Sequence, residues 1–250
     1  MRHQIYEDIY RAELTHWWFC ARRSIVAALI RRFASPHRPL RVADVGCGMG
    51  STLTMLTEFG TVIGLDYSPT ALAFSQQRGQ RRLVTAALPH LPLPTGSCDV
   101  VCALDVIEHI DDDGSAVREL WRICKPAGLM VITVPAYNWL WSEHDDVNEH
   151  KRRYVRSELQ RLLALPGARV LRLSYMNFVL APPLIAFRLI QKLIRRRKTN
   201  PNELTSDVRQ PSSLVNRLFY HLFAAEAAWL QHGRLPFGIS LIALVRKHAT

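Results

Sequence analysis

The stretch Asp44-Val45-Gly46-Cys47-Gly48-Met49-Gly50 sets one acid and three glycines directly after the apolar run 40–43. Glycines at the turn from a strand into a helix let the backbone approach a ligand that a Cβ atom would exclude. The spacing here is GxGxG, whereas the dinucleotide-binding fingerprint is GxGxxG. A second acid, Asp66, ends the next apolar run, 61–66. The loop therefore predicts a ligand site where two neighbouring strands end.

Strand-like and helix-like segments alternate on both sides of this loop. Parallel strands need crossover helices on both faces of a sheet, so the alternation predicts a doubly wound α/β fold. Ser68 and Pro69 suit an N-cap and a first turn, and 157–160 reads as a capping box. The expected strands are 40–46, 61–66, 81–86, 98–107, 129–136, 168–176 and 238–247; the expected helices are 10–34, 51–59, 68–77 and 111–128.

Composition narrows the class of protein. The chain has 250 residues, of which 48% are hydrophobic, and 32 Lys plus Arg against 21 acids give a formal charge of +11. Such a charge favours acidic partners, whether nucleic acid, anionic lipid or a phosphorylated substrate. Five scattered cysteines offer neither a disulfide framework nor a zinc cluster, and the polar start is unlike a secretory signal. A reduced, cytoplasmic setting is the expectation.

Three motifs together carry a family resemblance: DVGCGMG at 44–50, LDYSP at 65–69 and LPLPTGSCDVV at 91–101. Over roughly residues 40–176 the chain resembles the class I S-adenosylmethionine-dependent methyltransferases, in their small-molecule group of methyltransferase types 11 and 23. The resemblance implies a seven-stranded Rossmann-like sheet and S-adenosylmethionine as the cofactor. It places Asp105 near the cofactor, and the other implied cofactor contacts are Asp44, Gly46, Cys47, Gly48 and Gly50 for the methionine part and Asp66 for the ribose.

The adenine end departs from the family pattern. Members of the family often carry an acid shortly before the LPLP segment, and Ala87 stands at that position here. We therefore expect the adenine to rely on backbone amides and on packing by Tyr67 or Leu88. A carboxylate accepts two hydrogen bonds from a vicinal diol, so Asp66 suits the ribose as the resemblance implies.

Candidates for the methyl-transfer chemistry follow the fourth and fifth expected strands. Sites in open α/β sheets lie beyond the carboxyl ends of the strands. His144 is the first candidate for a general base, His150 the second, and His109 the third, because a neutral imidazole accepts a proton near neutral pH. No metal site is expected, because the histidines and acids of this region show no distinctive ligand spacing.

The loop 136–155 and the leading helix supply the candidate substrate contacts. In NEHKRRY, 148–154, we expect Arg152 or Arg153 to pair with a substrate phosphate or carboxylate, or with an internal acid such as Asp145 or Asp146. On the leading helix, two aromatic residues and two arginines could line a pocket for an apolar anionic molecule. The alternative is that the two aromatic residues pack on the core. The full set of candidate substrate contacts is Trp17, Trp18, Arg22, Tyr137, Trp141, Arg152, Arg153 and Tyr154; for Tyr154, anchoring the loop is the alternative.

The segment 177–237 reads as a helical insertion before the last strand. Its apolar run 178–187 is shorter than the roughly 20 residues of a spanning helix, and a basic cluster at 195–198 follows. Two interpretations stay open: an apolar lid over the substrate, or a helix lying on an anionic membrane surface. We thus expect one domain over 1–250: a leading cover (1–39), a cofactor-binding core (40–176), the insertion (177–237), and a last strand with its tail (238–250).

The resulting functional hypothesis is methyl transfer to a small-molecule or lipid-like, anionic acceptor by in-line displacement. A peripheral position at the inner membrane face is compatible with it. The alternatives are an RNA methyltransferase, suggested by the positive charge, and a non-catalytic cofactor-binding protein at a membrane. Nucleic acid is the weaker partner hypothesis because no recognisable RNA-binding module accompanies the predicted sheet.

Overall fold

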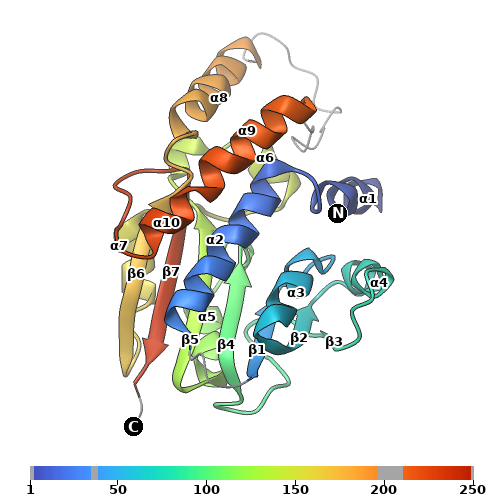
Figure 1. Cartoon of the computed structure of the whole chain (residues 1–250), viewed down its shortest axis with the longest axis vertical. Coiled ribbons are helices and arrows are strands. Elements are labelled where there is room, and N and C mark those ends of the chain that lie inside the picture. Colours follow the sequence, from blue (N-terminus) through green and yellow to red (C-terminus); the bar gives the residue numbers. More distant parts are fainter. Residues whose placement is uncertain (1–2, 35–38, 196–210, 249–250) are drawn as a thin grey trace.

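A seven-stranded sheet forms the centre of the computed structural model, which describes residues 3–34, 39–195 and 211–248 (Figure 1). The strand order is β3-β2-β1-β4-β5-β7-β6, and β7 runs antiparallel to both of its neighbours. The predicted doubly wound α/β fold is confirmed. The strands are β1 (Leu40–Val45), β2 (Gly60–Asp66), β3 (Leu83–Thr85), β4 (Cys98–Leu104), β5 (Cys124–Pro135), β6 (Ala168–Met176) and β7 (Ser240–Lys247).

Helices cover both faces of this sheet. The leading segment, expected as one helix, forms two helices with a turn between them. The buried His16 caps the second of these by accepting from the Trp18 N–H at 3.3 Å, and burial lowers the pKa of His16 to about 4. The α-helices are α1 (His3–Ala12), α2 (Trp17–Phe33), α3 (Ser51–Leu56), α4 (Pro69–Gln77), α5 (Asp113–Ile123), α6 (Glu143–Val147), α7 (Arg156–Leu162), α8 (Ala181–Arg195), α9 (Ser213–Ala224) and α10 (Glu226–Leu230), with 3-10 turns η1 (Thr57–Phe59), η2 (Ile107–His109) and η3 (Asn138–Leu140).

The two faces of the sheet carry separate hydrophobic cores. Successive residues of a strand point to opposite faces, so paired positions share a core. Across β1, β4 and β5 the register is Val42 with Val100 and Val100 with Leu129, and all three pack under α2 and α9. The next positions along each strand, Ala43, Val101 and Met130, join the core that α5 and α7 cover.

Several element boundaries differ from the expected ones. Helix α5 ends at Ile123, and Pro126 and Gly128 belong to the start of β5, where the pairing with β4 shifts register. Strand β4 ends at Leu104 because Asp105 takes a left-handed backbone, with φ of 59°. The N-cap of α7 is Val155, two residues before the Ser157 of the expected capping box, and Glu158 accepts from the N–H of Val155 at 2.9 Å.

The insertion before the last strand is helical, with α8, α9 and α10 in its described part. Its base is fixed by Glu226 of α10, whose carboxylate accepts from the backbone N–H groups of Asn177, Phe178 and Val179 at 2.7, 2.7 and 3.2 Å. Helix α8 and the start of α9 project beyond the edge where the parallel strands end (Figure 1). None of the helices described here combines the length and the apolarity that crossing a bilayer requires.

Candidate active site

The glycine loop after β1 is shaped by its contacts with β2. Gly46, Gly48 and Gly50 have φ of 72°, 52° and 85°, values that favour glycine. The N–H groups of Gly46 and Cys47 both donate to the Leu65 carbonyl, at 2.7 and 3.0 Å. A Cβ on Gly48 would meet no atom within 4 Å. At Gly48 the loop therefore presents open backbone at this edge of the sheet.

Asp66 holds the loop from the end of β2. One carboxylate oxygen accepts from the N–H of Gly48 at 2.8 Å and the other from the N–H of Ser68 at 2.9 Å. The backbone N–H of Tyr67 is a further partner of this carboxylate. Each carboxylate oxygen has two lone pairs, so the group as a whole keeps acceptor capacity. Ser68 in turn caps α4 by accepting from the N–H of Ala71 at 3.2 Å, as its position in the sequence predicts. Beside it, the Tyr67 side chain is exposed.

Asp44 is a buried carboxyl with an unsatisfied oxygen. It is 2% exposed, and its Oδ2 has no hydrogen-bond partner. Burial raises its pKa to about 7, an effect that Arg22 opposes and Asp66 reinforces. Buried polar atoms in native proteins are nearly always hydrogen-bonded, so an unsatisfied one marks a place where a ligand, an ion or water belongs. Asp44 is thus prepared to accept a hydrogen bond from a cationic donor.

The leading helices bring charged side chains to the same edge. Arg22 of α2 is buried and forms an ion pair with Asp105, whose other oxygen accepts from the Thr133 hydroxyl at 2.9 Å. The Nε of Arg22 has no hydrogen-bond partner. Glu13 lies in the turn between α1 and α2, and its Oε2 is 3.1 Å from the Nη2 of Arg78. Burial raises the pKa of Glu13, although the positive charges of Arg78 and Arg22 act to lower it. Sequence reasoning missed Glu13, because nothing in its local pattern distinguishes it from a solvated helix end.

The loop after β5 is organised around a fully buried acid, Asp145. Arg153 donates two hydrogen bonds to it, from Nε at 2.7 Å and Nη2 at 2.8 Å, and the N–H of Ser142 donates a third at 2.8 Å. The Nδ1 of His150 lies 2.9 Å from the same carboxylate. Burial alone would raise the pKa of Asp145, but the hydrogen bonds from His150 and Arg153 hold it well below its usual range. Of the two kinds of partner expected for Arg153, the structure supplies the internal acid.

Neighbouring residues tie this loop to the end of β4. Arg152 forms an ion pair with Asp113, with Nη1 and Oδ2 3.1 Å apart. The hydroxyl of the buried Tyr154 donates a hydrogen bond to the same carboxylate at 2.9 Å. The backbone N–H of Lys151 donates to the carbonyl of Glu108 at 2.9 Å. The segments that follow β4 and β5 therefore form one unit at the carboxyl edge.

Two of the three candidate bases lie together. The rings of His109 and His150 are nearly perpendicular, with centroids 4.8 Å apart. Burial and the neighbouring His150 lower the pKa of His109, so its imidazole is neutral near pH 7. His144 belongs to α6, and its side chain lies outside the described part of the structure.

The candidate aromatic residues divide between two environments. Trp17 and Trp18 pack α2 against α9, where Trp18 stacks on Phe223 with centroids 5.2 Å apart. At the carboxyl edge, the ring of Tyr137 stacks on those of Tyr175 and Phe237, with centroids 5.1 and 5.5 Å away. Trp141 donates its indole N–H to Asp146 at 2.9 Å. Tyr137 and Trp141 therefore line the same edge as the histidine pair, whereas the two leading tryptophans hold helices together.

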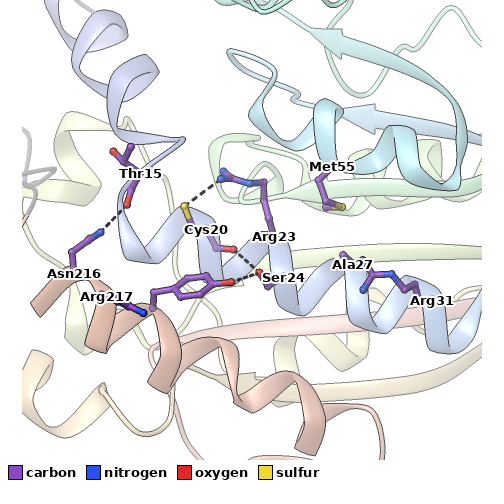
Figure 2. Close-up of a pocket in the computed structure, with 10 residues that line it drawn as sticks. Thr15, Cys20, Arg23, Ser24, Ala27, Arg31, Met55, Asn216 and Arg217 are labelled. Atoms are coloured by element: carbon purple, nitrogen blue, oxygen red, sulfur yellow. Dashed lines mark hydrogen bonds between the residues drawn. The ribbon is translucent and has the colours of Figure 1, made fainter. Parts of the chain in front are cut away.

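A pocket of about 590 Å³ lies between α2, α3 and α9, apart from the glycine loop (Figure 2). Three arginines and no acid line it, and Asn216 closes one end by donating to the Thr15 carbonyl at 2.8 Å. Such a lining suits an anionic group. The lining residues are Thr15, Cys20, Arg23, Ser24, Ala27, Arg31, Met55, Asn216, Arg217 and Tyr220.

Comparison with known proteins supports the family resemblance. Residues 43–132 match the family model described as a methyltransferase domain. A probable S-adenosylmethionine-dependent methyltransferase of Mycobacterium tuberculosis is 32% identical over 125 residues, which is 49% of this chain and 44% of that protein. A ubiquinone biosynthesis O-methyltransferase of Rhodopseudomonas palustris is 33% identical over 112 residues, 40% of this chain and 42% of the relative. The chain thus spans less than half the length of these two curated relatives.

Solved structures match over more of the chain at lower identity. The methyltransferase in the complex with the Trm112 activator of Haloferax volcanii has a TM-score of 0.61 and 17% identity, covering 98% of this chain and 95% of that one. The [4+2]-cyclase SpnF has a TM-score of 0.57 and 17% identity, covering 91% and 81%. These likenesses establish the class I methyltransferase fold and leave the chemistry to the residues of the site.

Proposed function

We propose that this chain, which contains a class I methyltransferase domain, transfers a methyl group from S-adenosylmethionine to a small-molecule or lipid-like acceptor. The observation that carries the proposal is the buried, unsatisfied carboxyl of Asp44 beside an open glycine loop. A loop that served only to connect β1 with α3 would gain nothing from a buried acid without a partner.

The residues of this edge fit the cofactor part by part. In the proposal, Asp44 accepts from the amino group of the cofactor, the two oxygens of Asp66 accept from the ribose hydroxyls, and the exposed ring of Tyr67 packs beside the adenine. Gly46, Cys47, Gly48 and Gly50 would supply the backbone cradle, and Leu88 would pack on the adenine. Arg22 pairs with Asp105 and has an unsatisfied Nε, and in the proposal it donates to the carboxylate of the cofactor.

The bound cofactor supplies an electrophilic methyl group, so the chain's own residues mainly orient the acceptor and manage its proton. We assign that proton to the pair His109 and His150, whose rings are in contact. Tyr137 and Trp141 are assigned to the binding of the acceptor. Arg153 and Tyr154 contribute indirectly by fixing the loop, and Arg152 does so through Asp113.

The acceptor class is inferred from the surface beside this edge. Apolar side chains of α8 and α9 are exposed there, and α9 also contributes Arg217 to the arginine-lined pocket. An apolar helix face with adjacent cations suits a lipid-like molecule with an anionic group, or the anionic membrane surface that holds it. A relative named for O-methylation in ubiquinone biosynthesis acts, by its name, in the making of a lipid-like product. The exposed apolar residues are Phe187, Leu189, Ile190, Leu214, Val215 and Leu218.

The proposal is tested with methyl-labelled S-adenosylmethionine and a fractionated host extract. We expect label to enter a lipid or small-molecule fraction with the wild-type protein and not with Asp44→Asn. Label confined to RNA would replace this proposal with an RNA methyltransferase. Tight cofactor binding without label in any fraction would indicate a protein that binds the cofactor without transferring its methyl group.

A further inference from the structure

Glu108, His109 and His150 form a cluster whose donor atoms lie within 4.8 Å of one another. Two of them come from the turn η2 after β4 and the third from the loop after β5. We propose that this cluster binds one divalent transition-metal ion of the zinc class. The site itself is independent of the cofactor, whereas its role in handling an acceptor oxygen rests on the proposed function.

Glu108 is the residue that most favours a bound cation at this place. Its side chain is 0% exposed, and apart from its own backbone amide neither carboxylate oxygen has a hydrogen-bond partner. The two nearby guanidinium groups are committed elsewhere, Arg22 to Asp105 and Arg153 to Asp145. A buried carboxylate needs a proton, a cation or hydrogen bonds to offset its desolvation. A metal ion held between Glu108 and two imidazoles would supply that cation.

Both histidines are oriented by partners behind them, as metal-bound histidines usually are. Asp145 accepts from the Nδ1 of His150 at 2.9 Å, which puts the proton on Nδ1 and the lone pair on Nε2. Asp145 is itself held by two hydrogen bonds from Arg153 and one from Ser142. The ring of His109 donates to the backbone carbonyl of Glu149. Each imidazole thus presents its other nitrogen from a fixed ring.

The donor set selects the kind of ion. Two imidazoles with one carboxylate suit Zn²⁺ and similar first-row ions, whereas Mg²⁺ and Ca²⁺ prefer oxygen ligands only. Ligand distances of about 2.0–2.2 Å require the donor atoms to approach one another more closely than the 4.8 Å within which they lie here, so binding would draw the three side chains together. Three protein ligands leave a fourth position on the ion. In the proposed enzyme an acceptor hydroxyl would occupy it and lose its proton to solvent more readily. With the ion bound, the two imidazoles would promote that loss as ligands of the ion and would not themselves accept the proton.

The sequence did not indicate this site because its ligands have no motif spacing along the chain. Glu108 and His109 are adjacent, and His150 reaches them only through the folding of the loop after β5. The loop is held there by backbone and side-chain contacts, among them the Lys151 N–H to the Glu108 carbonyl.

The test is metal binding by the full chain after chelator treatment and dialysis, without cofactor or acceptor. Co²⁺ serves as the visible probe and Zn²⁺ as its competitor, each titrated alone into the wild type, Glu108→Gln, His150→Ala and His90→Ala. His90 is the control because it is an exposed histidine outside the cluster. We expect one Co²⁺ per chain with d–d absorption that Zn²⁺ displaces, and affinity reduced by more than roughly 100-fold in the two cluster variants only.

Three results would overturn the proposal: no stoichiometric Co²⁺ binding by the wild type, unchanged binding by Glu108→Gln, or equal loss in His90→Ala. Glu108→Gln keeps the side-chain shape and removes the carboxylate ligand, so it decides the question even where His150→Ala folds poorly. Because the titration uses neither cofactor nor acceptor, its failure is distinguishable from failure of the proposed methyl transfer.

Discussion

Asp44 and Asp145 are both buried carboxyls at the carboxyl edge of the same sheet, with exposures of 2% and 0%. Asp145 has its cation within the chain, because Arg153 donates two hydrogen bonds to it and its pKa is held well below the usual range. Asp44 has an oxygen without a partner and a pKa raised by burial to about 7. A paired buried acid shapes a loop, whereas an unpaired one is destabilising until a ligand arrives.

Removing the paired acid should give the largest effect. Asp145→Ala leaves the guanidinium of Arg153 buried without its partner, so we expect the free energy of unfolding to fall by about 3–5 kcal/mol. Urea denaturation measures it. The double variant Asp145→Ala with Arg153→Met should recover most of the loss, because no buried charge is then left unpaired. A loss below about 1 kcal/mol for the single variant would show that the pair contributes little to the fold.

Removing the unpaired acid should have the opposite effect on stability. Asp44→Asn eliminates a buried charge, so at pH 8 we expect the protein without cofactor to be about 1–3 kcal/mol more stable. Its affinity for S-adenosylhomocysteine should fall roughly 100-fold, because the charge-assisted hydrogen bond to the amino group is lost. Thermal unfolding and calorimetric titration measure the two effects.

Asp99 provides the matched control for that variant. It is a buried acid at the start of β4, paired with Lys125 at 3.0 Å and accepting from the N–H of Arg41 at 2.9 Å. Asp99→Asn should lower stability and leave cofactor affinity unchanged. If both variants lower cofactor affinity equally, Asp44 has no special role in binding.

A pH series should show the unpaired state of Asp44 through a smaller change in cofactor affinity. The folded pKa of Asp44, about 7, exceeds its unfolded value of about 4, so the native state holds a proton that the unfolded state has lost. Stability from this group is therefore present below about pH 4 and lost as pH rises toward 7. Affinity for S-adenosylhomocysteine should rise by about tenfold between pH 6 and 8 as the carboxylate forms. A wild-type profile as flat as that of Asp44→Asn would contradict this assignment.

The smallest expected effect is a difference in cofactor affinity between alanine variants of two glycines that have similar backbone conformations. Gly48 and Gly79 have φ of 52° and 84°, and a Cβ on either would meet no atom within 4 Å. Each change to alanine should cost about 1 kcal/mol of stability for the left-handed backbone. Only Gly48→Ala should also weaken cofactor binding, by roughly tenfold, because its Cβ would enter the ligand space. Equal affinities would place the cofactor away from this turn.

Much of the fold could be predicted because its signals are local. Apolar runs located all seven strands, and Ser68 with Pro69 marked the start of α4. Predicted element boundaries were wrong where pairing between strands overrides local preference. Pro126 and Gly128 predict the end of a helix, but β5 already pairs with β4 at Cys124. The glycine loop and Asp66 could be predicted to lie together because they follow two neighbouring strands, and the structure joins them through the hydrogen bond from the Gly48 N–H to Asp66.

The sequence by itself determined the sheet, the glycine loop and the acids that follow β1 and β2, because each depends on residues that are near neighbours along the chain. Only the tertiary structure decided which acids are paired. Arg22 meets Asp105, Arg153 meets Asp145, and His150 approaches Glu108. These partners belong to different elements, and a charge pattern does not specify which cation a buried carboxylate will meet. The packing of the elements sets that choice, and with it whether an acid holds a loop or stays available for a ligand.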